Sequence, residues 1–256
     1  MKIIFLGTNG WYDTDTGNTP CVLIETGDRF IILDAGFGIY KVKQHILSDK
    51  PVSLFITHLH YDHLIGLHTL PILKLAQGID VYANKAIMKG LQSFLRRPYT
   101  TPPLLLPTKL RFYAVAGDSD SPVKFKTAKL RHSVTCHGYK FYIEGKTVSY
   151  CTDTGMCGNL KKLAKDADLL ITECALAPQP AKLAGMAPGD KLQNPFHITP
   201  QTAAMVACKT GAKRLALLHF DPAKYPTLES RKGAEKAAGN IFKETIAAND
   251  GMVIEI

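Results

Sequence analysis

The stretch FITHLHYDHLIGL, residues 55–67, decides the fold of this chain. It places His58, His60, Asp62 and His63 directly after the apolar run VSLFIT. That run of β-branched and aromatic residues predicts a buried strand. His58 and His60 are two positions apart, so at a strand end both would face the same side, and Asp62 and His63 begin the next turn. These side chains predict a metal site at the carboxyl end of a strand.

The composition is that of a folded globular chain. Of its 256 residues, 46% are apolar and 21% are charged, which excludes a disordered protein. The opening MKIIFLGTNGW has too short an apolar run for a signal peptide, and no later run approaches the length of a membrane span. The six cysteines form no CxxC pair, which argues against a zinc knuckle or a disulfide framework. We expect a cytoplasmic protein without a membrane partner.

The chain is basic, with a formal net charge of +9. Lysines and arginines gather at 96–97, 124–131, 161–165 and 209–214. A positive field favours anionic partners such as phosphates or RNA. A lysine-rich surface that serves solubility explains the charge equally well.

Strands and helices alternate through both halves of the chain, and no linker divides them. We expect strands at 2–6, 20–25, 30–35, 52–57, 79–83, 122–132, 138–153, 166–174, 214–220 and 251–256. Helices are expected at 38–47, 64–76, 86–97, 201–212 and 228–247, the second of them interrupted at Pro71. This order predicts one α/β domain over residues 1–256, with a sheet-on-sheet core covered by helices.

Two proline-rich stretches, 96–108 and 175–196, are candidate lids, because long loops in compact domains are usually functional. The alternative for 96–108 is a surface crossover whose leucines cap the core.

The chain resembles the metallo-β-lactamase superfamily, whose leading motif reads H-x-H-x-D-H after an apolar strand. The resemblance continues in the family's order over essentially the whole chain. It includes LRHSVTCHGYKF with His132, VSYCTDTG with Asp153 and LALLHFDPAKY with His219. It implies the family's α/β fold, a four-layer αββα sandwich.

The resemblance also implies two divalent metal ions as cofactors. They would be held by two groups of side chains and one bridging aspartate: His58, His60 and His132 for the first ion, Asp62, His63 and His219 for the second, and Asp153 between them. Nitrogen and oxygen ligands suit zinc best, and manganese or iron also fit. The ions would share a bridging hydroxide that attacks the substrate. Asp34, in ILDAG, is expected to orient the imidazoles, as an aspartate does at this place in the family.

The later motifs YCTDTG, LLITECAL and HITPQTAA look like ribonuclease Z and its phosphodiesterase relatives. In that branch a glutamate and a histidine assist proton transfer to the leaving oxygen, and Glu173 and His197 match these positions. Together with Asp62 they are the candidate catalytic residues. The structural alternatives are a strand-end salt bridge for Glu173 and a hydrogen bond beside a helix start for His197.

One departure from that branch concerns the substrate. Ribonuclease Z carries a long arm that grips tRNA between the positions of His132 and Asp153, and only twenty residues separate these two here. We therefore expect a small or cyclic phosphodiester or a nucleotide as the anionic substrate, and RNA is not the favoured partner.

Three alternatives stay open. The same metal site suits a lactone or thioester (acyl) hydrolase, whose acyl chain the LLLP segment at 104–107 would accommodate. A ribonuclease Z-like RNA endonuclease is the second. The third is a nucleic-acid binder that uses the fold only as a scaffold. The complete set of metal ligands argues against this third alternative. The resemblance and the apolar loop also suggest a homodimer.

Overall fold

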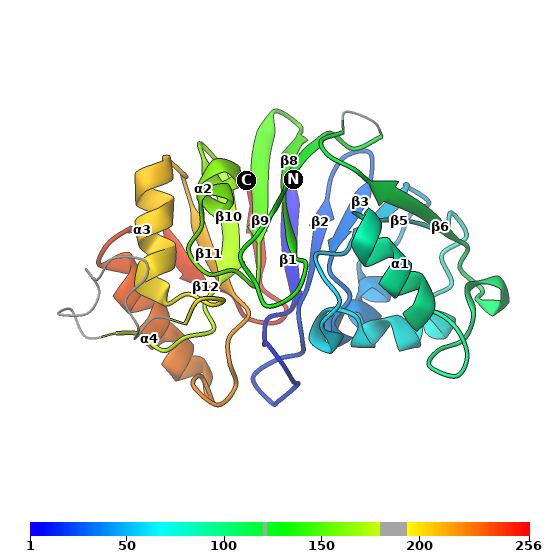
Figure 1. Cartoon of the computed structure of the whole chain (residues 1–256), viewed down its shortest axis with the longest axis horizontal. Coiled ribbons are helices and arrows are strands. Elements are labelled where there is room, and N and C mark those ends of the chain that lie inside the picture. The colour runs from blue at the N-terminus through cyan, green and yellow to red at the C-terminus, as the bar shows by residue number, and fades with distance from the viewer. Residues whose placement is uncertain (120–121, 180–193) are drawn as a thin grey trace. The chain divides into compact units, whose positions relative to one another are not determined.

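The computed structural model describes residues 1–119, 122–179 and 194–256. By its internal contacts the chain divides into two compact units, residues 1–116 with 249–256, and residues 117–248. Each unit contains one β-sheet and its own helices (Figure 1). A single domain over residues 1–256 stays a prediction. Within the described ranges, no helix combines the length and the apolar character needed to cross a bilayer.

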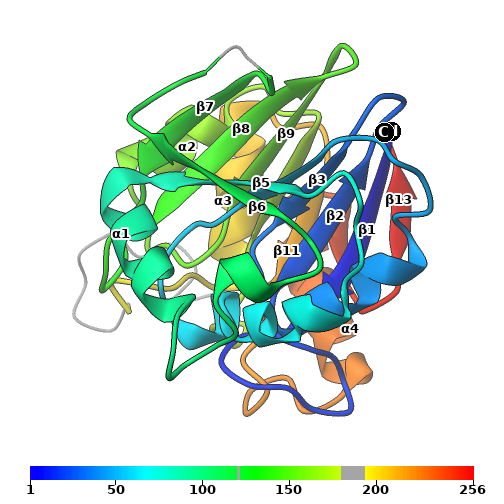
Figure 2. The same cartoon turned by 90° about the vertical axis from the view of Figure 1, so that its right-hand side faces the viewer.

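The first unit contains a seven-stranded sheet in the order β13-β1-β2-β3-β4-β5-β6. Its strands are β1 (Lys2–Gly7), β2 (Cys21–Glu25), β3 (Phe30–Leu33), β4 (Val52–Phe55), β5 (Ile79–Asn84), β6 (Leu110–Val115) and β13 (Val253–Glu255). The strands from β13 to β3 pair antiparallel, and those from β3 to β6 pair parallel. Figure 2 shows β13, β1, β2 and β3 side by side, so the two ends of the chain meet in one sheet.

Short helices connect these strands, namely η1 (Phe37–Gln44), η2 (Tyr61–His63), η3 (Ile65–Ile72), α1 (Lys85–Phe94) and η4 (Pro103–Leu105). Side chains of η1, η3 and α1 pack with one face of the sheet into an apolar core. The predicted helices 38–47 and 64–76 are present as tighter 3₁₀ helices. Pro71, which was expected to kink or break the second helix, lies inside it, and the helix ends one residue later at Ile72.

The second unit contains a six-stranded sheet in the order β12-β11-β10-β9-β8-β7. Its strands are β7 (Phe125–Lys129), β8 (His137–Ile143), β9 (Lys146–Cys151), β10 (Leu169–Glu173), β11 (Leu215–Leu218) and β12 (Thr245–Ala247). The first three form an antiparallel meander, and β9 to β12 are parallel. Helices α2 (Gly158–Ala164), α3 (Pro200–Thr210) and α4 (Leu228–Gly239) pack on this sheet, with α3 against β11 and α4 against β12 (Figure 1).

The predicted helix over 228–247 is wrong in its extent. It ends at Gly239, and Thr245–Ala247 instead form β12, paired parallel with β11. Glycine and asparagine end the helical pattern at 239–240, and the isoleucine and threonine that follow favour a strand. Strand β6 and helix α2 were not predicted, because β6 is half-exposed and lacks a continuous apolar run, and α2 is only 7 residues long.

Candidate metal centre

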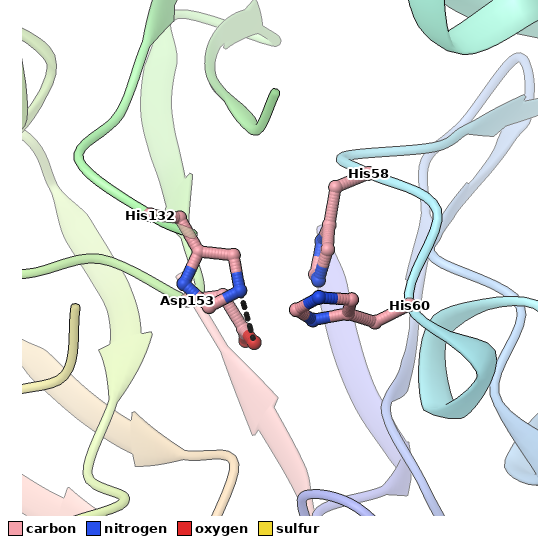
Figure 3. Close-up of side chains that lie close together, drawn as sticks. All are labelled: His58, His60, His132 and Asp153. Carbon is pink, nitrogen blue, oxygen red and sulfur yellow. Dashed lines mark ion pairs between the residues drawn. The ribbon is translucent and has the colours of Figure 1, made fainter. Parts of the chain in front are cut away.

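In the first unit, the metal-capable side chains follow β4. His58 and His60 lie on the extended segment after this strand, and Asp62 and His63 belong to η2. Three of the four are buried, and His60 is half-buried. The ring of His58 lies 4.7 Å from that of His60 and 4.1 Å from that of His63, measured between centroids. Figure 3 shows His58 and His60 on their shared loop. We call these four residues the first ligand group.

Asp34 and Thr57 fix the orientation of two of these imidazoles. The Oδ2 atom of Asp34 lies 2.8 Å from Nδ1 of His63, the contact expected of a residue that orients this imidazole. Thr57 donates its backbone N–H and its hydroxyl to the same carboxylate, at 2.8 and 3.0 Å. Since that hydroxyl donates to Asp34, it accepts from Nδ1 of His58 at 3.0 Å. Both histidines therefore carry their proton on Nδ1, and Nε2 is the nitrogen suited to a metal.

Asp62 accepts a hydrogen bond that the sequence does not predict. The backbone N–H of Trp11 donates to its Oδ2 atom at 2.8 Å, and this atom lies 3.7 Å from Nε2 of His63. Trp11 belongs to the loop after β1 and has a left-handed backbone, with a φ of 58°. The sequence carries no signal for this contact, because it joins two loops 51 residues apart.

In the second unit, Asp153 lies between two imidazoles. Its Oδ1 atom is 3.0 Å from Nε2 of His219, and its Oδ2 atom is 3.6 Å from Nε2 of His132. The latter ion pair is the dashed line in Figure 3. Asp153 follows β9, His219 follows β11, and His132 lies between β7 and β8. All three side chains are almost completely buried. We call these residues the second ligand group.

Besides Trp11, three residues of the candidate site have a strained backbone. Asp34, Asp153 and His219 have φ values of 59°, 53° and 56°, in the left-handed region that non-glycine residues seldom occupy. Such a conformation costs on the order of 1 kcal/mol and is concentrated at functional sites. Each of these residues follows a strand of its sheet, so the strain coincides with the predicted site positions.

Glu173 and His197 form a buried pair in the same unit. Glu173 ends β10 and is fully buried, and its Oε2 atom lies 3.1 Å from Nδ1 of His197. The backbone N–H groups of Thr154 and Ile198 also donate to this carboxylate. Burial alone would lower the pKa of His197, but the hydrogen bond and the negative charge of Glu173 outweigh it and raise the pKa above its ordinary value.

The imidazole of His197 borders the second ligand group. Its ring centroid lies 5.3 Å from that of His132 and 6.2 Å from that of His219. If His197 is protonated, it would lie next to an ion held by His132 and His219. A general acid is needed at such a place to protonate the leaving group of a substrate.

The donor set fits divalent cations. The first ligand group supplies three imidazoles and a carboxylate, and the second supplies two imidazoles and a carboxylate. Burying carboxylates among neutral imidazoles is costly without a cation to compensate their charge. Nitrogen and oxygen donors without thiolate suit zinc, manganese or iron.

The structure describes all of the candidate lid 96–108 but only part of the candidate lid 175–196. In 96–108, Leu104 and Leu105 are exposed at η4, by 97% and 62%, whereas Leu106 packs on the core. Of these three leucines, Leu106 alone packs on the core, as the crossover alternative predicts for all of them. Most of 175–196 lies outside the described residues.

Comparison with known proteins gives consistent matches. Residues 29–220 match the family model described as "Beta-lactamase superfamily domain". The ribonuclease Z of Nostoc punctiforme is 27% identical over 319 residues, covering 100% of this chain and 96% of the relative. That alignment is longer than the 256 residues of this chain, so the relative contains segments that this chain lacks.

Two solved structures share the fold. The metallo-β-lactamase fold protein YhfI from Bacillus subtilis has a TM-score of 0.79 at 21% identity, covering 100% of this chain and 98% of its own. Human tRNase Z, short form, has a TM-score of 0.74 at 24% identity, covering 100% and 99%. These matches confirm the predicted fold class, an α/β protein with two sheets, and the predicted resemblance to the ribonuclease Z-like branch.

Proposed function

The chain belongs to the β-lactamase superfamily, and on this premise we propose that it is a dinuclear metal-dependent phosphodiesterase acting on a small or cyclic phosphodiester or a nucleotide. The observation that carries the proposal is the buried pair of Glu173 and His197. Metal ligation does not require this pair. Cleavage of a phosphodiester does call for a proton donor to the leaving alkoxide, and His197 has the environment of one.

We propose that the two ligand groups together hold two divalent ions. The assignment is the one that the family resemblance implies: His58, His60 and His132 for one ion, Asp62, His63 and His219 for the other, and Asp153 between them. The single domain predicted over residues 1–256 would bring these groups together. Zinc is the first choice, with manganese or iron as alternatives. When bound, such ions lower the pKa of a water and compensate the charge of phosphate oxygens.

The remaining residues have separable roles in this proposal. Asp34 and Thr57 hold His63 and His58 in the tautomer that ligation needs. Asp62, fixed by the N–H of Trp11, is both a ligand and the acceptor for a proton of the attacking water. His197 donates a proton to the leaving oxygen, and Glu173 keeps its imidazole oriented and protonated.

The second unit supports a small substrate. Strands β8 and β9 are joined by a two-residue turn, in which Glu144 and Gly145 both have positive φ, as in a type I′ hairpin. The chain between His132 and Asp153 is therefore a plain hairpin, without an arm of the kind that grips tRNA.

An acyl hydrolase is the second candidate function. The observation that favours it is the exposure of Leu104 and Leu105, which would suit an acyl chain. A ribonuclease Z-like RNA endonuclease is a third reading, supported by the relative of that name. A cytoplasmic location and a homodimer also stay predictions.

A substrate panel tests the proposal. The purified protein, supplied with zinc or manganese, is assayed on bis-p-nitrophenyl phosphate and 2′,3′-cyclic nucleotides, and in parallel on lactones and aryl esters. We expect turnover of the phosphodiesters. Turnover of the lactones or esters alone would assign the protein to the acyl hydrolases. The Asp153→Ala variant, purified in the same way, controls for contaminating enzymes.

A further inference from the structure

A pocket of about 320 Å³ opens in the first unit beside the first ligand group. Its lining includes Leu59, Tyr61, Leu64, Phe94, Arg96 and Tyr99. The volume lies within the range of small-molecule sites. All the lining residues belong to the described part of the chain, in the segment 59–64 or in α1 and the turn after it.

The pocket is lined in part by residues that alternate in sequence with the candidate metal ligands. Leu59 stands between His58 and His60 in the sequence, and Tyr61 stands between His60 and Asp62. Leu59 and Tyr61 are therefore sequence neighbours of the ligands, and a molecule in this pocket contacts the same segment that carries them. The same short segment therefore presents ligands and pocket-lining side chains in alternation.

Aromatic rings dominate the rim of the pocket. Tyr61 is 73% exposed and Tyr99 is 68% exposed, although both rings would gain from burial. The ring of Tyr61 lies 6.3 Å from that of Phe94, at an angle of 45°. Exposed aromatic side chains around a concave surface indicate a binding site for a flat or apolar group.

Arg96 gives the pocket its charge. Of the residues described as lining it, Arg96 is the one with a charged side chain. The backbone N–H of Tyr99 donates to the carbonyl of Arg96 at 2.9 Å, and that of Thr100 donates to the same carbonyl at 3.1 Å, so a hydrogen-bonded turn holds Arg96 and Tyr99 next to each other. A guanidinium binds phosphate through two parallel hydrogen bonds and also stacks on rings.

We propose that this pocket binds a nucleobase of the substrate, with the base stacked on Tyr61 and Tyr99 and a phosphate of the same nucleotide bound by Arg96. The proposal rests on the phosphodiesterase function proposed above and specifies its substrate class as a nucleotide or a short single strand. A fatty acid would match the leucines and Arg96 of the pocket, but it would leave the exposed rings of Tyr61 and Tyr99 without a stacking partner. The remaining hydroxyl of the lining, that of Ser93, already donates to the carbonyl of Lys89 at 3.1 Å. Stacking without base-reading groups predicts little discrimination among bases.

The kinetic test compares two substrates with one leaving group, thymidine 5′-(p-nitrophenyl phosphate) and methyl p-nitrophenyl phosphate. For the wild type we expect kcat/KM to be at least 10-fold higher for the thymidine ester. Tyr61→Leu and Tyr99→Leu should each lower this value about 10-fold for the thymidine ester and leave the methyl ester unchanged. Tyr61→Phe, which keeps the ring, is the matched control and should behave as the wild type.

A binding test separates the pocket from the catalysis. 2-Aminopurine riboside 5′-monophosphate is titrated with the holoprotein, since stacking quenches its fluorescence. We expect quenching, with a Kd raised about 10-fold in Tyr61→Leu, Tyr99→Leu and Arg96→Gln and unchanged in Tyr61→Phe. The pocket assignment stands if this pattern appears, even if no phosphodiester is hydrolysed and the proposed function fails. It is overturned if phosphodiesters are hydrolysed without preference and the probe is not quenched. Displacement of the probe by octanoate but not by nucleotides, or masking of the pocket in a dimer, would also overturn it.

Discussion

The carboxylate of Glu173 lies 3.1 Å from the imidazole Nδ1 of His197, a contact between residues 24 positions apart in the sequence. Glu173 is fixed at the end of β10 and accepts further hydrogen bonds from the backbone of Thr154 and Ile198. Backbone groups of the second unit thus hold this pair, and the role proposed for it can be tested separately from metal binding.

Replacing His197 by alanine should slow phosphodiester cleavage according to the leaving group. Removal of a general acid costs about 10²–10⁴-fold for an alkoxide, as in a dinucleotide, and little for p-nitrophenolate, which needs no proton. The measurement is kcat on both substrates, with metal content determined on the same samples. Replacing His68, an exposed histidine of the first unit, provides the control. Loss of bound metal, or an equal loss on both substrates, would contradict the role of His197.

Asp34→Asn should weaken metal binding without unfolding the first unit. The amide keeps the shape of the carboxylate but places a donor or a weaker acceptor opposite Nδ1 of His63, where Asp34 now lies at 2.8 Å. Loss of such a support typically lowers metal affinity about 10–100-fold. Competition with a chelator measures the change. Asp28→Asn, at an exposed aspartate paired with Arg29, is the matched control, and equal metal affinity in the two variants would refute the proposed support.

Gly155→Ala should impair the proton donation by His197 to the leaving oxygen, because it displaces the chain that leads into His197. A Cβ atom at this position would lie 1.9 Å from the carbonyl oxygen of Pro195, so the segment that leads into His197 has to move. We expect a fall in kcat with the leaving-group dependence of the His197 variant. Gly158→Ala is the control, because a Cβ there meets nothing within 4 Å. A Gly155→Ala enzyme with wild-type kinetics would show that this close approach does not position His197.

Asp168 should make a pH-dependent contribution to the free energy of unfolding. Burial tends to raise the pKa of this carboxyl, but hydrogen bonds from Lys213 and from Thr147 outweigh it and lower the pKa below 3.8. A lowered pKa means that the folded state releases the proton more readily than the unfolded one. The stabilisation is therefore present at neutral pH and is lost as the pH falls through the pKa of the folded state.

Asp168→Asn is accordingly expected to lower the free energy of unfolding by about 1–2 kcal/mol at pH 7 and by much less near pH 3. Urea unfolding at both values measures the difference between variant and wild type. A difference that stays constant or grows toward pH 3 would be inconsistent with the ionised carboxylate as its source.

The sequence predicts the parts of the site that depend on short-range pattern. The spacing of His58, His60, Asp62 and His63 after an apolar strand predicts the first ligand group, whereas Asp34 was expected from the family resemblance. His132, Asp153 and His219 were likewise expected from the family resemblance, which places each of them after a strand.

Contacts between distant loops could not be predicted in this way. The hydrogen bonds from the hydroxyl of Thr57 to Asp34 and from the N–H of Trp11 to Asp62 join residues 23 and 51 positions apart, so they depend on the folded path of the backbone. The nucleobase pocket likewise forms only when α1 approaches the segment 59–64. The prediction of helix fails after Gly239 because β12 is only three residues long and is held by its pairing with β11, which lies far from it in the sequence.

The most direct test of the central claim is a metal titration of activity. Apoprotein is supplied with zinc or manganese in steps, and hydrolysis of bis-p-nitrophenyl phosphate is followed together with the metal bound, in the wild type and in Asp153→Ala. The proposed dinuclear phosphodiesterase should reach full activity at two bound ions per chain, and the variant should bind less metal and show no activity. Full activity without metal or at one ion per chain, or a variant that keeps both ions and turnover, would contradict the account.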